Sequence, residues 1–192
     1  MTQSAQAAGS SNYPSLFPGQ NARTFAEIRA DENAHVAYLQ NALGSNAFPQ
    51  PQFQNRTIPS NNPTLFVATA AIFENTGVGA YLAGWAFVTQ PTLAKAAGVL
   101  ADEASHSGYL NTLINLPIVL NGAPIAPPFS PTGVLQNIGA LVVDMTFPQQ
   151  LVAIISTTPS AQNDVAILPF ALLLEYLEAA YYNTDVRTFF GV

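Results

Sequence analysis

Hydrophobic residues recur at steps of three and four in four long stretches of the chain, a spacing typical of amphipathic helices. The pattern predicts helices over about residues 24–43, 63–88, 91–116 and 165–183. Gly44 is placed to end the first helix, and Pro91 suits the start of the third. Residues 45–62 are rich in Pro, Asn and Gln and predict a long irregular connection. We therefore expect an all-α fold built on a four-helix bundle.

A further apolar stretch, residues 131–157, lies between the third and fourth helices, and Pro148 divides it. It predicts an extra helical segment, either two short helices or a helix and an extended piece. Residues 1–20 lack the charged and apolar regions of a signal peptide and predict a flexible tail. Because the chain has 192 residues and no mid-chain block of charge, we expect residues 21–192 to form a single domain.

Charge is scarce and mostly negative. Only 8% of the residues are charged and the formal net charge is -6, so no basic surface is expected and nucleic acid is excluded as a partner. There is no cysteine, which excludes disulfides and thiolate metal sites. The sequence has no run of about 18 uninterrupted apolar residues, so we expect no transmembrane segment. Polarity comes mainly from Asn, Gln, Ser and Thr, which favours an extracytoplasmic or secreted location over a cytoplasmic one.

One ten-residue phrase occurs twice in the chain. Residues 30–39 are ADENAHVAYL and residues 101–110 are ADEASHSGYL. Each copy contains Glu-x-x-His, and the two copies hold both histidines of the chain. On a helix this spacing puts a carboxylate and an imidazole on the same face, one turn apart, where both can bind one metal ion.

Two further glutamates lie on apolar stripes of the other two helices. Glu74 precedes Tyr81 by seven residues, and Glu175 precedes Tyr182 by the same number. Buried carboxylates need a counter-charge, and the five Lys and Arg residues lie mostly near helix ends or in loops. Two divalent metal ions would balance four carboxylates, while two neutral imidazoles complete the ligand set. Glu178 could replace Glu175, join it or point to solvent, and the tyrosine spacing favours Glu175.

The segments EIRADENAHVAYLQNALG, AAIFENTGVGAYLAGW, VLADEASHSGYLNTL and ILPFALLLEYLEAAYY resemble the four helices of the ferritin-like superfamily. They most resemble its branch of plant desiccation-related and fungal stress-related secreted proteins. The resemblance implies a metal-ligand set of Glu32, His35, Glu74, Glu103, His106 and Glu175, with Glu178 as the alternate. It also implies that Asp31 and Asp102 each orient a histidine on another helix.

The tyrosines of the two lone-glutamate helices, Tyr81 and Tyr182, are candidates to hydrogen-bond the ligands or to pass electrons. The alternative is that they are core residues with a satisfied hydroxyl. Asp185, three residues after Tyr182, is expected to be solvated.

The order of the helices differs from the family pattern. Family members begin with a lone Glu helix, whereas this chain begins with Glu-x-x-His and ends with the helix of Glu175. This order is typical of a circular permutation, which a bundle tolerates when the cut falls in an exposed loop. The last helix could complete the bundle of its own chain or of a neighbour, so a homo-oligomer with exchange of this helix is possible.

Two functions remain open. The first is a dimetal carboxylate protein, with two iron ions or alternatively manganese or mixed metals, that acts on dioxygen or peroxide as an oxidase, peroxidase or catalase in stress protection. The second is a structural or self-assembling protein in which metal only stabilises the bundle or is absent. Iron storage is a weaker third option because the chain lacks a surplus of acidic residues to nucleate mineral.

Overall fold

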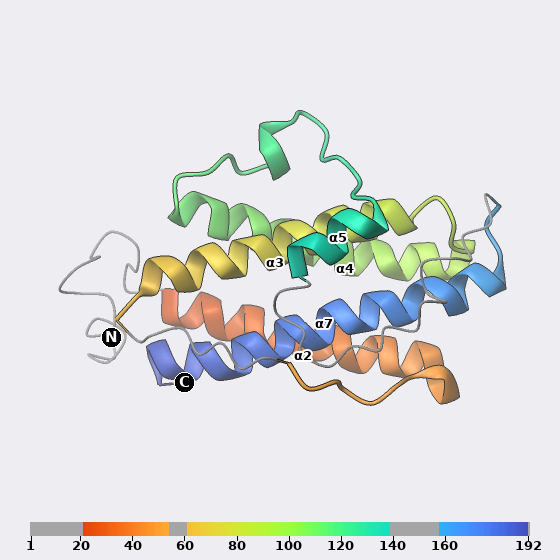
Figure 1. The fold of residues 1–192 in the computed structure, drawn as a ribbon, viewed down its shortest axis with the longest axis horizontal. Coiled ribbons are helices and arrows are strands. Elements are labelled where there is room, and N and C mark those ends of the chain that lie inside the picture. The colour runs from red at the N-terminus through yellow and green to blue at the C-terminus, as the bar shows by residue number, and fades with distance from the viewer. Residues whose placement is uncertain (1–20, 54–60, 139–157, 192) are drawn as a thin grey trace.

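The computed structural model describes residues 21–53, 61–138 and 158–191 (Figure 1). Four long helices make up the bundle: α2 (Asn21–Leu43), α3 (Pro63–Gly84), α4 (Gln90–Leu113) and α7 (Ala161–Phe190). The connections contain a short helix, α5 (Pro131–Ile138), and two 3-10 turns, η1 (Gly44–Asn46) and η2 (Leu120–Gly122). The all-α helical bundle expected from the periodicity is confirmed.

The long helices pack as two antiparallel pairs, α2 with α7 and α3 with α4, and α3 also contacts α7 (Figure 1). The start of α2 and the end of α7 lie at the same end of the bundle. There the rings of Phe25 and Phe190 stack with their centroids 5.2 Å apart. Helix α7 therefore completes the bundle within its own chain.

Two groups of buried apolar side chains lie toward opposite ends of the bundle. One is aromatic: Phe66 of α3 stacks on Phe189 of α7 with ring centroids 4.8 Å apart, and Tyr181 donates a hydrogen bond to the Phe66 carbonyl oxygen. The other contains Leu39 of α2 and Leu172 of α7. Between them, at the middle of the bundle, the helices bury polar side chains instead.

The bounds of two helices differ from those expected, and capping contacts explain the difference for α7. Helix α7 begins at Ala161 because Ser160 caps it, its Oγ accepting a hydrogen bond from the Asn163 N–H. It continues to Phe190 and stops at Gly191, which has a positive φ of 69°. Helix α3 ends four residues earlier than expected, at Gly84.

Two predictions fall outside the described residues. The flexible tail was predicted over residues 1–20, and most of the extra apolar segment lies in residues 139–157. The described part of that segment, α5, is helical and packs on α3.

Helices α3 and α7 are long and apolar enough to cross a membrane by length and composition alone. Their apolar windows are 56% and 50% buried against the rest of the protein. Core helices of a bundle have the same character, and both of these helices carry a buried glutamate.

Candidate metal centre

The six predicted ligands come together in the middle of the bundle. Helix α2 supplies Glu32 and His35, α4 supplies the equivalent pair of the second motif, and α3 and α7 each supply one glutamate. The glutamates are fully buried and the two imidazoles nearly so; the set is Glu32, His35, Glu74, Glu103, His106 and Glu175. Because the apolar stripes of four helices face inward, the i to i+3 spacing points each Glu and His pair at the bundle axis.

The first group of side chains surrounds the Nδ1 atom of His35. This atom lies 3.1 Å from Glu175 Oε2, 3.3 Å from Glu32 Oε2 and 3.7 Å from Glu103 Oε1. One donor atom from each of these four residues lies within 4.8 Å of the others, close enough for one metal ion to contact them all.

The second group surrounds the Nδ1 atom of His106. This atom lies 2.9 Å from Glu32 Oε1 and 3.2 Å from Glu74 Oε2. Glu32 therefore belongs to both groups, with one carboxylate oxygen near each imidazole, and could serve as a ligand in either group.

The outer nitrogens of both imidazoles face aspartates of the opposite motif. His35 Nε2 lies 3.4 Å from Asp102 Oδ2, and His106 Nε2 lies 3.3 Å from Asp31 Oδ2. A carboxylate on the outer nitrogen fixes the ring so that Nδ1 points inward. The two repeated phrases thus support each other across the bundle.

Two tyrosine hydroxyls bind the lone glutamates, also across the bundle. Tyr81 of α3 donates to Glu175 Oε1 of α7, and Tyr182 of α7 donates to Glu74 Oε1 of α3, each at 2.5 Å. Because Glu and Tyr have the same spacing in α3 and α7, each tyrosine reaches the glutamate of the other helix. Each lone glutamate keeps its other oxygen directed at an imidazole.

Burial sets the protonation of the cluster. It raises the pKa of Glu32 to about 7 and that of Glu103 well above the ordinary value, with nearby carboxylates adding to both shifts. Burial alone lowers the pKa of His35, but the carboxylates of Glu175 and Glu32 outweigh it and raise the pKa to about 11. The pKa of His106 is raised to about 11 in the same way, by Glu32 and Glu74. Without metal, protons are the counter-charge.

The donor set fits divalent metal ions. Both carboxylate oxygens of Glu103 are buried without any hydrogen-bond partner. Both histidines form ion pairs with these glutamates. A buried carboxylate without partners is costly, and a mixed set of carboxylates and imidazoles is typical of iron and manganese sites.

Comparison with known proteins agrees with this geometry. The profile of a family described as "Ferritin-like domain" matches residues 2–116, more than half of the chain. The chain belongs to the ferritin-like family. No curated protein and no solved structure matches it. The matched part of this ferritin-like chain includes α2, α3 and α4, whereas α7 follows it.

Glu178, the alternate ligand on α7, is buried in this ferritin-like bundle but belongs to neither group of donor atoms. Burial raises its pKa well above the ordinary value, and Glu74 and Glu32 raise it further. The sequence expectation that Asp185 is solvated is wrong, because its side chain is 2% exposed. Asp185 follows Glu178 by two turns of α7, so the same face that buries one buries the other.

Gly77 is a site residue that sequence reasoning missed. It follows Glu74 by one turn, and a Cβ atom built on it would lie 1.9 Å from Glu103 Oε2. The glycine thus makes the space that the Glu103 carboxylate occupies. Its spacing of one helical turn from Glu74 was the available signal.

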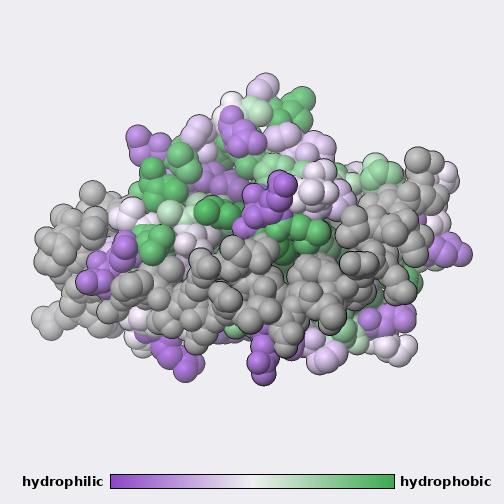
Figure 2. Space-filling model, viewed as in Figure 1, coloured by the Kyte–Doolittle hydropathy of each residue, from purple (hydrophilic) through white to green (hydrophobic). Residues whose placement is uncertain are grey.

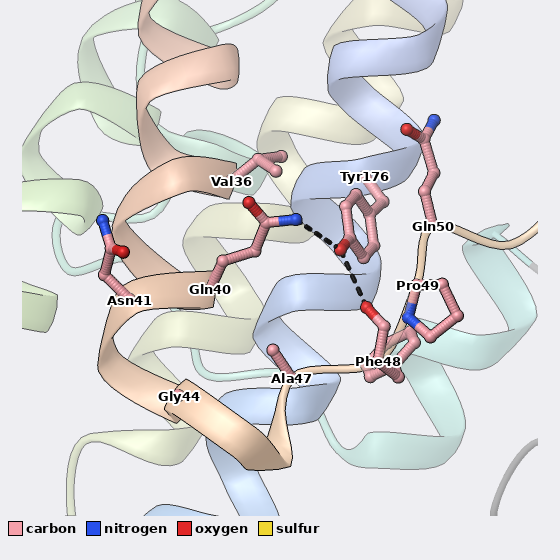
Figure 3. A pocket seen from close by; sticks show the side chains of 9 residues that line it. All are labelled: Val36, Gln40, Asn41, Gly44, Ala47, Phe48, Pro49, Gln50 and Tyr176. Carbon is pink, nitrogen blue, oxygen red and sulfur yellow. Dashed lines mark hydrogen bonds between the residues drawn. The ribbon is translucent and has the colours of Figure 1, made fainter.

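A polar cleft of about 590 Å³ lies on the outside of the bundle, between α2, η1 and α7 (Figure 3). In it Gln40 Nε2 donates to the Tyr176 hydroxyl, which donates to the Phe48 carbonyl oxygen. Tyr176 directly follows Glu175 but faces this cleft, on another side of α7. None of the predicted ligands lines the cleft, so it is separate from the candidate metal centre.

Proposed function

We propose that this protein binds two metal ions, iron in the first instance, and acts on dioxygen or peroxide in an oxidase, peroxidase or catalase-type reaction. The observation that carries the proposal is Glu103. Its two buried oxygens have no hydrogen-bond partner, and the carboxyl groups around it raise its pKa further. Such an arrangement is costly without metal. Membership of the ferritin-like family supports the same conclusion.

The ligand assignment follows the two groups of donor atoms. One ion would be held by His35, Glu103 and Glu175 and the other by His106 and Glu74, and Glu32 belongs to both groups. When bound, iron or manganese ions supply redox chemistry toward dioxygen species.

The residues around these ligands would hold the ligands in their orientation and exclude water. Tyr81 and Tyr182 hold the outer oxygens of the lone glutamates, while Asp31 and Asp102 orient the imidazoles. The apolar groups at both ends of the bundle keep bulk water away.

Metal analysis of purified protein, reconstituted anaerobically with iron(II) or manganese(II), tests the proposal. We expect about two ions per chain in the wild type. His106→Ala should lose ions, while Glu27→Gln, at an exposed glutamate that pairs with Arg23, should not. Fewer than about 0.2 ions per wild-type chain with either metal would contradict a dimetal centre of the kind this ligand set forms.

We also propose that the helix order is a circular permutation of the family order. The family match ends at residue 116, and α7 nevertheless supplies Glu175 and lies beside α2. A rearranged chain tests this. In it residues 158–191, which contain α7, are placed before α2 and joined to residue 21 by a short linker. Because Phe190 already stacks on Phe25, we expect this chain to keep the fold and the metal content. Failure to fold would contradict the proposal.

A structural or assembling role is the second candidate, because hydrophobic side chains are exposed between α4 and α5. Ile118 is 64% exposed and Ile125 is 83% exposed. Figure 2 shows hydrophobic residues reaching the surface in separate groups among hydrophilic ones. Sedimentation of wild type and of an Ile118→Ser, Ile125→Ser variant tests this role. A wild-type chain that stays monomeric at tens of micromolar would exclude it.

A further inference from the structure

Two adjoining apolar cavities lie beside the candidate metal centre. The larger, of about 350 Å³, is lined by α3 and the residues after it, by the start of α5 with the residues before it, and by the first turns of α7, and it is partly open to the surface. The smaller, of about 40 Å³, lies between α3, α4 and α7. We call them the large cavity and the small cavity.

The two cavities share a wall and lead toward the metal ligands. Ala80 and Gly84 of α3 and Ile167 and Phe170 of α7 line both cavities. Tyr81 lines the small cavity, and its hydroxyl donates to Glu175. A molecule in the large cavity is therefore separated from a predicted metal ligand by the small cavity and one tyrosine.

The lining of the large cavity selects against charge. Among the residues that the structure describes, no Asp, Glu, Lys, Arg or His lines it, and the one side-chain hydroxyl among them, Ser130 Oγ, accepts a hydrogen bond from the Gly133 N–H. Burying an ion there without a partner would cost several kcal/mol. Its volume is within the range of small-molecule sites, roughly 300–1,000 Å³. A neutral, apolar molecule fits both conditions.

Specific contacts hold the cavity walls in place. The Phe129 ring lies against Gly79, where a Cβ atom would come within 2.5 Å of it, and the Phe129 N–H donates to the Gly79 carbonyl oxygen. On the opposite side, Asp164 of α7 accepts hydrogen bonds from the Thr89 N–H and from the Thr92 hydroxyl. The space is thus built into the fold.

We propose that the large cavity binds a small, neutral, apolar organic molecule, and that this is the class of substrate presented to the metal centre past Tyr81. The substrate role rests on the proposed function. Binding in the large cavity requires no metal ion, so the binding proposal and the substrate role can fail separately.

Trp85, the single tryptophan of the chain, lines the small cavity and reports on binding. Nitrobenzene, a neutral apolar quencher, is titrated into metal-free protein while tryptophan fluorescence is followed. We expect saturable quenching in the wild type. Ala83→Phe, which fills the large cavity, should weaken binding about tenfold or more, whereas Ala94→Phe on the exposed face of α4 should not change it.

Ala166→Phe, from the α7 wall, repeats the test should Ala83→Phe prove unfolded by circular dichroism. Quenching that rises linearly without saturation, as collision with the half-exposed indole would give, overturns the binding proposal. Equal saturable quenching in the wild type and a folded cavity-filling variant also overturns it.

Cobalt(II) in the metal centre tests the link to the ligands. Nitrobenzene should change the visible spectrum of cobalt-loaded wild type and of Ala94→Phe, but not that of Ala83→Phe. An unchanged wild-type spectrum with saturable quenching overturns the substrate role. Saturable quenching without any cobalt binding leaves the cavity proposal standing and counts against the dimetal centre.

Discussion

His35 and His106 have matching surroundings, each lying between a lone glutamate and an aspartate of the other motif, but the two motif glutamates differ. Glu32 reaches both imidazoles, whereas Glu103 lies near His35 alone. A repeated sequence would place the two glutamates alike. Since the Glu-x-x-His motif is the same in both copies, the difference arises from the side chains around it.

The lone-glutamate helices differ at one position that faces the cluster. One turn after Glu74, α3 has Gly77, and one turn after Glu175, α7 has Glu178. The glycine leaves room into which the Glu103 carboxylate extends, and Glu178 adds to the raised pKa of Glu103. The two groups of donor atoms are consequently unequal, although the scaffold around them is nearly symmetric.

Replacement of the motif glutamates should produce the largest difference. Because Glu32 contributes to both groups of donor atoms, Glu32→Ala should remove both metal ions. Glu103→Ala should leave about one ion, at the site of His106 and Glu74. Metal content after reconstitution measures both. Equal losses in the two variants would mean that the motif glutamates are equivalent when metal is bound.

The next largest effect should come from a substitution that fills the space at Gly77. In Gly77→Ala the new methyl group would overlap Glu103 Oε2, so the carboxylate must move. We expect a loss of about 1–3 kcal/mol in the free energy of unfolding of the metal-loaded protein, from overpacking, and reduced metal content.

Gly98→Ala is the matched control for this change. Gly98 is an exposed glycine of α4 with nothing within 4 Å of an added Cβ atom. There alanine should stabilise the helix by about 0.5–1 kcal/mol. If both variants are stabilised, the Glu103 carboxylate does not depend on the glycine.

Much of this arrangement could be predicted from the repeated phrase. The helical period placed Glu32 and Glu103 on inward stripes, and the scarcity of basic residues pointed to metal. The pairing of Tyr81 with Glu175 across the bundle could not be predicted, because it depends on how α3 and α7 approach each other. Spacing along one helix carries no such information.

The position of Glu103 could not be predicted from the sequence either. It depends on the space beside Gly77, a residue without a Cβ atom on another helix. Asp185 was misjudged for a related reason. Its charge suggested solvent, but α7 is enclosed on more sides than its pattern of polar residues indicated. The cavities beside Tyr81 come from packing among α3, α5 and α7, which no local pattern encodes.

The stability of the metal-free protein should fall as the pH rises from about 5 to about 9. Glu32 has its pKa raised from 4.5 to about 7, so deprotonation costs stability across that interval. His35 and His106 have pKa values raised from 6.5 to about 11, so their contribution is complete below pH 6.5 and is lost above it. Thermal unfolding at several pH values measures the trend.

Metal-loaded protein is the control for this trend. Metal ions replace the protons and bind more tightly as the ligands deprotonate, so its melting temperature should hold or rise over the same range. Parallel curves for the two forms would show that the cluster is not what titrates.

The smallest effect should come from Glu178→Gln, which removes a charge without changing shape. Since Glu178 belongs to neither group of donor atoms, metal content should stay at the wild-type level, whereas Glu175→Gln should lower it. In the metal-free protein burial raises the pKa of Glu178 well above 4.5, so the variant should match the wild type most closely at pH values below that ordinary value. As the pH rises above 4.5, folding must keep a proton on the wild-type carboxyl that the unfolded chain releases, so the wild type loses stability that the variant keeps. Loss of a metal ion in Glu178→Gln would instead make this residue a ligand, and the inequality between the two halves would then arise from α7 more than from Gly77.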